Sequence, residues 1–288
     1  METPPGGRGF GQRLTQIQNL EHRNLLSWQE RLGKIWDKRA ADPYAFTPHE
    51  WRDKVTLEES LRKNKELGAF GTKYLIETAF RGNPEVILDR LKEGRKVLAG
   101  GYGKGFDSPW LKEATLAGLQ TTWVDVSTNI SRAAQIDMDK QWKAIQEAQE
   151  GKDFLPVPTV IQGELSSVLT DPEGLGLDLD LVEVFYMCRT LSCLSKRGAK
   201  KVLQIMGRSL RAELDRLDKP LDERRKIVLV TPLKDNNPDR VGKTSIFFSR
   251  KMILDNIRRG AGRSVVAINE RNHDYYDQIY TGMTIVAK

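Results

Sequence analysis

Cysteine and histidine are scarce in this chain. Of its 288 residues, two are cysteines, Cys188 and Cys193, and three are histidines. Two neighbouring cysteines in an apolar stretch cannot build a disulfide framework or a four-ligand zinc site, and we interpret them as reduced core residues. His22, His49 and His273 have no partners at metal-ligand spacing. We therefore expect no metal site.

The chain also lacks long apolar runs, and neither sign of charge dominates it. No stretch approaches the roughly 18 apolar residues of a membrane span, and the N-terminus does not resemble a secretory signal. A cytoplasmic protein without membrane contact is expected. The net charge is +7, but the basic residues are spread along the chain and no aromatic-rich RNA-binding signature accompanies them. Nucleic acid is therefore a less favoured partner than a small molecule.

The chain changes pattern near residue 68. Residues 1–11 are rich in glycine and proline and are predicted to be a disordered tail. Residues 12–67 are predicted to be a strand-free helical extension that could act as a lid. Helix starts are predicted at Thr47, followed by Pro48, and at Thr56, with the second helix ending at Gly68. Residues 68–288 form the main predicted domain.

Short apolar runs alternate with longer amphipathic segments in this domain. The predicted strands are 96–99, 122–126, 159–162, 181–187, 227–231, 264–269 and 280–286. The predicted helices are 72–81, 83–93, 109–117, 130–147, 198–216 and 245–259. Such alternation predicts an α/β fold, with a mostly parallel seven-stranded sheet and helices on both faces. The link 270–279 is too short for a crossover helix, so the last two strands should form an antiparallel hairpin.

The first predicted strand runs into a glycine-rich turn that contains Gly100, Gly101, Gly103 and Gly105. Glycines let the backbone turn sharply and let a ligand approach where a Cβ atom would clash. The next strand ends in Asp125, about 20 residues further on, where such folds place the carboxylate that holds a ribose. The pattern predicts a nucleotide-type binding turn.

Residues 70–288 resemble the class I S-adenosylmethionine-dependent methyltransferase superfamily. The first motif of that family is an acid, any residue, and then Gly-x-Gly-x-Gly, which residues 101–105 match in their glycines. Asp125 matches the acid of the second motif, and Gly163-Glu164 matches a pair near the adenine. One departure is Ala99, which stands where the family has the acid that orients the glycine turn and the amino-acid part of the cofactor.

The resemblance implies a Rossmann-like fold, S-adenosylmethionine as cofactor and S-adenosylhomocysteine as product. The predicted cofactor contacts at the matching motifs are Gly100, Gly101, Gly103, Gly105, Asp125, Gly163 and Glu164. Tyr74, on the helix before the first predicted strand, and Arg189, just after the fourth, are two further predicted contacts.

Two other nucleotide motifs fit less well. A dinucleotide fingerprint, Gly-x-Gly-x-x-Gly, would need glycine where the chain has Phe106 or Ser108. The segment Val241–Ser245 resembles the end of a phosphate-binding loop, but the first glycine of that loop would fall on Asn237. Dehydrogenase and NTPase activities are therefore disfavoured.

Catalytic and substrate residues are less sharply indicated. His273, Asp235 and Tyr44 are weak candidates for the catalytic group, and Arg189, Asn236 and Tyr44 for substrate contact. Residues 189, 235 and 236 follow predicted strands, whose carboxyl ends bind ligands in such sheets. Packing and ordinary loop roles explain each residue equally well.

We expect methyl transfer to O, N or C of a small-molecule acceptor. Three alternatives stay open: an RNA or protein methyltransferase, an enzyme such as a cyclase that uses S-adenosylmethionine without methyl transfer, and a binding module that has lost catalysis. Monomer and homodimer are equally open.

Overall fold

The computed structural model describes residues 30–38, 41–42, 44, 47–80, 84–101, 110–149, 155–211, 220, 223–238 and 248–288. Its strands are β1 (Lys96–Gly100), β2 (Gln120–Asp125), β3 (Thr159–Gln162), β4 (Val182–Cys188), β5 (Lys226–Pro232), β6 (Val265–Tyr275) and β7 (Gln278–Ala287). Its helices are α2 (Leu57–Ala79), α3 (Pro84–Lys92), α4 (Trp110–Leu116), α5 (Thr128–Ala148), α6 (Leu165–Val168), α7 (Lys196–Arg211) and α8 (Arg250–Ala261). Residues 30–38 are helical as well.

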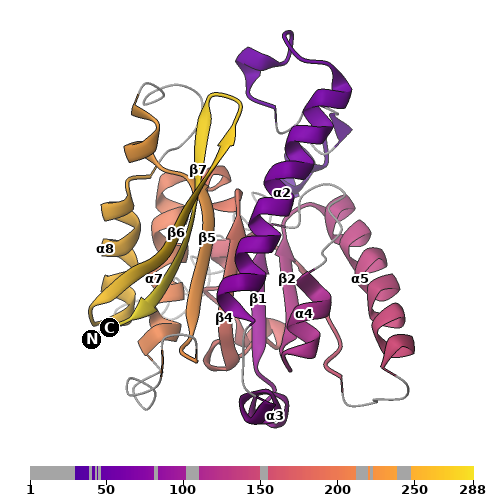
Figure 1. Ribbon diagram of the computed structural model, residues 1–288, viewed down its shortest axis with the longest axis vertical. Helices are drawn as coiled ribbons and strands as arrows, with labels where there is room; N and C mark the ends of the chain where they lie inside the picture. The colour runs from indigo at the N-terminus through magenta and orange to yellow at the C-terminus, as the bar shows by residue number, and fades with distance from the viewer. Residues whose placement is uncertain are drawn as a thin grey trace, which may run out of the picture.

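All seven strands form one sheet in the order β3-β2-β1-β4-β5-β7-β6 (Figure 1). The pairs from β3 to β5 are parallel, and β7 is antiparallel to both β5 and β6. The interior strand β5, which lies between β4 and β7, is buried along its whole length, as expected for a strand covered on both faces. The α/β fold class predicted from the sequence is therefore confirmed, including the terminal antiparallel hairpin.

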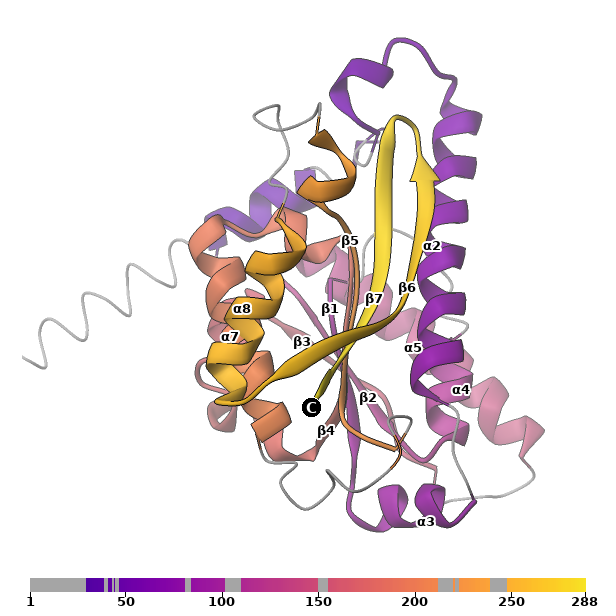
Figure 2. The same cartoon turned by 60° about the vertical axis from the view of Figure 1, so that its left-hand side comes forward.

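Helices cover both faces of the sheet (Figure 2). On one face α6, α7 and α8 pack on a core that includes Leu98, Phe185 and Leu229. On the other face α2, α4 and α5 pack on a second core that includes Val97 and Val228. Neighbouring residues of one strand enter opposite cores because successive side chains of a strand alternate between faces.

The helix α2 is longer than predicted. Thr56 caps it as expected, since its hydroxyl accepts a hydrogen bond from the Glu59 amide at 3.1 Å. The helix does not end at Gly68 but runs through to Ala79, and it includes the first part of the separate helix predicted at 72–81. Burial of Leu67 and Leu75 on either side of that glycine outweighs the cost of about 1 kcal/mol for glycine inside a helix.

Two further predictions of local structure are wrong. The predicted helix start at Thr47 is a short 3₁₀ turn, η1 (His49–Trp51), and the Thr47 hydroxyl instead contacts the Ser60 hydroxyl at 2.5 Å. The predicted link 270–279 is mostly strand, because β6 continues to Tyr275 and β7 begins at Gln278. These extended strand ends pack against α2, so tertiary contacts decide their conformation.

Candidate functional site

A cavity of about 300 Å³ lies at the carboxyl ends of β1, β2, β3 and β4. The chain runs outward from β1 to β2 and β3 on one side, then resumes at β4 on the other side of β1. Such a change of direction opens a ligand-binding crevice in α/β sheets. The walls draw on all four strand ends, α2 and residues 30–38: Leu32, Trp36, Gly68, Gly101, Trp110, Trp123, Asp125, Gly163, Glu164, Tyr186, Cys188, Arg189, Thr190 and Cys193.

The glycine turn begins at this cavity. Gly101 has a φ of 76° and donates its amide to the Val124 carbonyl at 2.8 Å. A Cβ atom here would lie 2.3 Å from Thr190 Oγ1, and that hydroxyl donates to the Gly100 carbonyl at 2.5 Å. A side chain at position 101 would therefore force Thr190 to move. Gly100 is buried and is not among the residues that line the cavity, and Gly103 and Gly105 lie outside the described residues.

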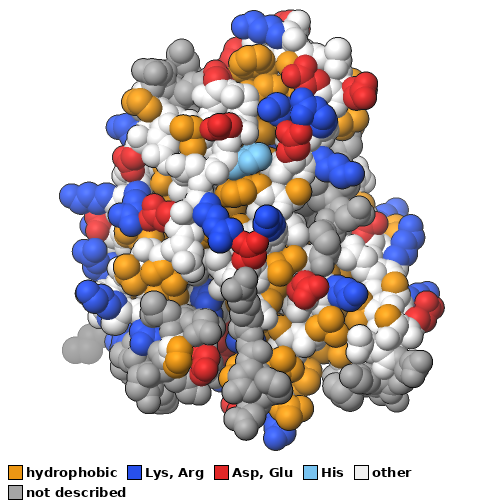
Figure 3. Space-filling model, in the orientation of Figure 1, with side chains coloured by type: hydrophobic (Ala, Val, Ile, Leu, Met, Phe, Trp, Pro, Cys, Tyr) orange, Lys and Arg blue, Asp and Glu red, His pale blue; other side chains and the backbone are white. Residues whose placement is uncertain are grey.

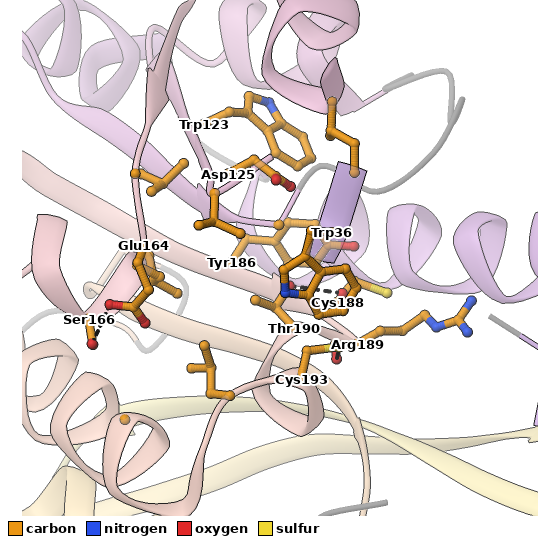
Figure 4. A pocket seen from close by; sticks show the side chains of 18 of the residues that line it. Trp36, Trp123, Asp125, Glu164, Ser166, Tyr186, Cys188, Arg189, Thr190 and Cys193 are labelled. Carbon is orange, nitrogen blue, oxygen red and sulfur yellow. Dashed lines mark hydrogen bonds between the residues drawn. The ribbon is translucent and has the colours of Figure 1, made fainter. Parts of the chain in front are cut away.

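Asp125 lies at the end of β2 with its side chain at the cavity wall (Figure 4). Its Oδ1 atom accepts a hydrogen bond from the Ser127 amide at 2.9 Å, and the residue is 8% exposed. The strand direction and this backbone contact fix the carboxylate. The sequence-predicted ribose residue and Gly101 therefore lie at one cavity.

The helical segment 30–38 covers the cavity next to β2. Asp37 accepts hydrogen bonds from the Ser127 hydroxyl and from the Asn129 amide, the latter at 3.1 Å, so it adds an anion to the N-terminus of α5. Leu32 and Trp36 of this segment line the cavity. The segment therefore joins the cavity wall to the start of α5.

The end of β3 brings Gly163 and Glu164 to the cavity. Glu164 Oε2 accepts hydrogen bonds from the Ser166 hydroxyl at 2.5 Å and the Ser167 amide at 2.8 Å. Figure 4 shows the Glu164 carboxylate turned toward Ser166. This oxygen therefore caps α6, a role that the sequence pattern did not reveal.

Arg189 follows β4 in a left-handed conformation with a φ of 65°. Its guanidinium group donates to Asn64 Oδ1 at 2.9 Å and lies 4.9 Å from the centre of the Tyr275 ring. Figure 4 shows this side chain directed away from Trp36 and the centre of the cavity. Arg189 lines the cavity, but its charged end connects β4 to α2 and the terminal hairpin.

The structure does not bring Tyr74 to the cavity, contrary to its predicted cofactor role. Tyr74 is 1% exposed, and its hydroxyl donates to the Asn269 carbonyl at 2.7 Å. Its ring packs against Gly282 of β7. Burial raises the pKa of Tyr74 to about 12, consistent with a neutral hydroxyl that fixes the hairpin to α2.

The weaker candidates on the hairpin side also lie outside the cavity wall. Asp235 accepts a hydrogen bond from the amide of Arg250, the first residue of α8, at 2.7 Å. Asn236 donates to the Thr281 hydroxyl at 2.7 Å. Both contacts are with the structural elements that follow β5.

His273 and Tyr44 are likewise absent from the wall. The His273 ring stacks on Phe70 with 4.9 Å between ring centres, and burial lowers the pKa of His273. The backbone amide of Tyr44 donates to Asp42 Oδ1 at 2.9 Å. Within the described residues, no group of three His, Cys, Asp or Glu side chains is arranged to hold a metal ion.

One wall of the cavity is aromatic, and no sequence pattern indicated it. In the register of the sheet Ala99 lies between Trp123 and Tyr186. Trp110 packs on both rings, with centre-to-centre distances of 5.1 Å to Trp123 and 5.7 Å to Tyr186. Strand alternation indicates that residues 99, 123 and 186 share a face only when the register of the three strands is known.

Burial also sets the protonation of the groups at the end of β4. It raises the pKa of Tyr186 well above its ordinary value and raises that of the Cys188 thiol. Both groups therefore keep their protons at neutral pH. Cys188 and Cys193 are free thiols, as expected from the sequence, but the prediction that both lie in the core is wrong, because Cys188 is only partly buried and Cys193 is exposed.

No protein-family model and no curated protein matches the chain. Among solved structures it is similar to an S-adenosylmethionine-dependent methyltransferase from Clostridium acetobutylicum, with 8% identity, a TM-score of 0.45, and coverage of 82% of this chain and 94% of that one. It is similar to an O-methyltransferase from Bacillus cereus in complex with S-adenosylhomocysteine (12% identity, TM-score 0.41, 79% and 91% coverage). It is also similar to the [4+2]-cyclase SpnF, with 12% identity, a TM-score of 0.48, and coverage of 90% of this chain and 96% of that one. At this level of similarity, the fold assignment depends on the strand order itself.

Proposed function

We propose that the cavity binds S-adenosylmethionine and that the protein transfers its methyl group to a small-molecule acceptor. The observation that carries this proposal is the meeting of Gly101 and Asp125 at one cavity, at the point where the strand order reverses. A glycine turn beside a strand-end carboxylate suits a nucleoside, because the turn admits the ligand and the carboxylate accepts hydrogen bonds from ribose hydroxyls.

The residues present fit the nucleoside end of this cofactor. Gly101 lines the cavity, and its lack of a side chain lets Thr190 pack against the start of the turn. Asp125 is held by the Ser127 amide before any ligand arrives. A prepositioned carboxylate loses little conformational entropy on binding. Gly163 and Val126 would bound the adenine side, since both line the cavity beyond β2.

When bound, the cofactor supplies a methyl group on a positively charged sulfur. The acceptor would bond to the methyl carbon as the carbon–sulfur bond breaks, the electron pair would stay on sulfur, and the acceptor proton would pass to bulk water once the product leaves the cavity. The chain would hold donor and acceptor in line and exclude water, and Leu32 and Trp36 would contribute to this as apolar residues of the cavity wall.

Two side chains near the reacting centre are not suited to act as bases. Tyr186 and Cys188 stay protonated at neutral pH because burial raises the pKa of each group. They can donate hydrogen bonds but do not readily take a proton. An acceptor that is already nucleophilic fits this site best.

The cavity walls favour a small acceptor. The lining is rich in aromatic and aliphatic side chains and holds few charged ones, as is usual for sites that bind small molecules. On the face that carries α2, Figure 3 shows acidic and basic side chains interspersed among the described residues. This surface offers less to a polyanion than a continuous basic patch would. Among the described helices, none has the length and apolar character needed to cross a membrane.

Isothermal titration calorimetry of the full chain with S-adenosylmethionine tests the cofactor assignment. We expect binding by the wild type and at least a tenfold loss in Asp125→Asn, because the amide removes the charge from the ribose hydrogen bonds. Asp139→Asn is the matched control, since Asp139 is an exposed residue of α5. Absence of binding by a folded wild type would refute the proposal. Product mass with candidate acceptors then separates a transferase from an enzyme that leaves the methyl group in place.

A further inference from the structure

Aromatic rings line the cavity near Gly101 and the end of β4. Trp123, Ala99 and Tyr186 are neighbours across three adjacent strands and share one face of the sheet. Trp110 lies against the rings of Trp123 and Tyr186. All three of these rings line the cavity, and Trp36 of the helical segment 30–38 lines it as well.

Trp36 approaches this wall from outside the sheet. Figure 4 shows its indole ring projecting from the helical segment 30–38 toward Tyr186 and the end of β4. The Asp37 contacts with Ser127 and Asn129 hold the segment in place. Trp36 is half-buried, whereas Trp110, Trp123 and Tyr186 are at most 4% exposed.

The chemistry of the ligand brings its charge to these rings. This step rests on the proposed function, in which Asp125 holds the ribose at the end of β2. The sulfur of S-adenosylmethionine is bonded to the 5′ carbon of that ribose, so it falls beyond β2 toward the ends of β1 and β4. Those are the strand ends that present Gly101 and Tyr186.

We propose that Trp36, Trp110, Trp123 and Tyr186 form an aromatic cage that favours the sulfonium of S-adenosylmethionine over the neutral sulfur of S-adenosylhomocysteine. Ring faces attract a cation through their quadrupole, and a desolvated site strengthens this attraction. The expected preference is about tenfold, the middle of the range for such contacts. Loss of the charge on methyl transfer would then weaken binding and assist release of the product.

The carboxylates of Asp125 and Glu164 would also favour a cation, so the test must separate rings from charges. Attraction between opposite charges weakens as salt is added, whereas contact with a ring face depends much less on salt. Removal of one ring that leaves both carboxylates in place separates the two causes directly.

The experiment compares the dissociation constants of S-adenosylmethionine and S-adenosylhomocysteine by calorimetry, at low salt and at about 0.5 M NaCl. Trp36→Leu removes the most accessible ring, and Trp36→Phe keeps a smaller one. Trp51→Leu is the matched control, because Trp51 is half-buried and contacts the Tyr276 ring rather than the cavity. Thermal melting establishes that each variant is folded.

We expect the wild type to bind S-adenosylmethionine about tenfold more tightly than S-adenosylhomocysteine at both salt concentrations. The ratio should fall to about threefold or less in Trp36→Leu, lie between these values in Trp36→Phe, and stay unchanged in Trp51→Leu. Equal or tighter binding of S-adenosylhomocysteine by the wild type would overturn the aromatic cage while leaving the cofactor assignment intact. An unchanged ratio of the two dissociation constants in Trp36→Leu would show that Trp36 is not part of the aromatic cage. Binding of neither ligand would refute the proposed function itself.

Discussion

Replacement of Gly101 by alanine should cost far more stability than the same change at another left-handed glycine. Alanine at a φ of 76° carries a backbone cost of about 1–2 kcal/mol. Its Cβ atom would lie 2.3 Å from Thr190 Oγ1, so Thr190 must move and lose its 2.5 Å bond to the Gly100 carbonyl, worth about 1 kcal/mol. Local repacking adds roughly 1–3 kcal/mol. The expected loss is about 3–6 kcal/mol.

Gly94 provides the matched control. It has a φ of 65°, and no atom lies within 4 Å of a Cβ built there, so Gly94→Ala should show only the backbone cost of about 1–2 kcal/mol. The assay is urea unfolding monitored by two probes, which tests two-state behaviour. Gly101→Ala should cost at least about 1 kcal/mol less in a Thr190→Ala background, because the clash and the hydrogen bond are both gone. Equal losses in Gly94→Ala and Gly101→Ala would refute the close-contact explanation.

Three further results are expected. Ala99→Asp should lower the free energy of unfolding by about 3 kcal/mol or more, increasingly so above the ordinary carboxyl pKa, because it buries a carboxylate between aromatic rings; unchanged urea unfolding would contradict this. Burial lowers the pKa of His273 below its ordinary 6.5, so the unfolded chain binds more protons as pH falls below that value. His273→Phe keeps the stack on Phe70 but removes the titratable group. Its unfolding free energy should therefore fall less than that of the wild type between about pH 7.5 and pH 5; equal losses would contradict this linkage. Asp37→Ala removes the contacts with Ser127 and should speed tryptic cleavage within residues 30–38; unchanged cleavage would show that Asp37 does not hold the segment.

The sequence predicted the sheet well because its strands are short apolar runs between clear breaks. The predicted strand 159–162 coincides with β3, and β1, β4, β5 and β7 begin and end within two residues of expectation. The predictions around Gly68 and at 270–279 were wrong where long-range packing outweighs local preference. Gly71 illustrates this, since a Cβ there would meet the Tyr186 hydroxyl at 2.8 Å, a contact between residues far apart in the chain.

Only those residues of the site that belong to a sequence motif could be predicted. Gly101 and Asp125 follow strands at recognisable spacing, and both line the cavity. No sequence motif marks Trp36, Trp123 or Tyr186. Their proximity depends on strand register and on the packing of the helical segment 30–38. Tyr74 was expected at the cofactor because it precedes the first predicted strand, but its ring packs against Gly282 of β7, a contact between residues far apart in the chain.

The crystal structure of the full chain with S-adenosylhomocysteine tests the central claim most directly. The account predicts ribose hydroxyls within hydrogen-bonding distance of the Asp125 carboxylate, about 2.5–3.0 Å, with the sulfur over the ends of β1 and β4 beside Tyr186. A nucleoside bound elsewhere, or an Asp125 carboxylate with no ligand contact in a crystal that holds the ligand, would contradict it.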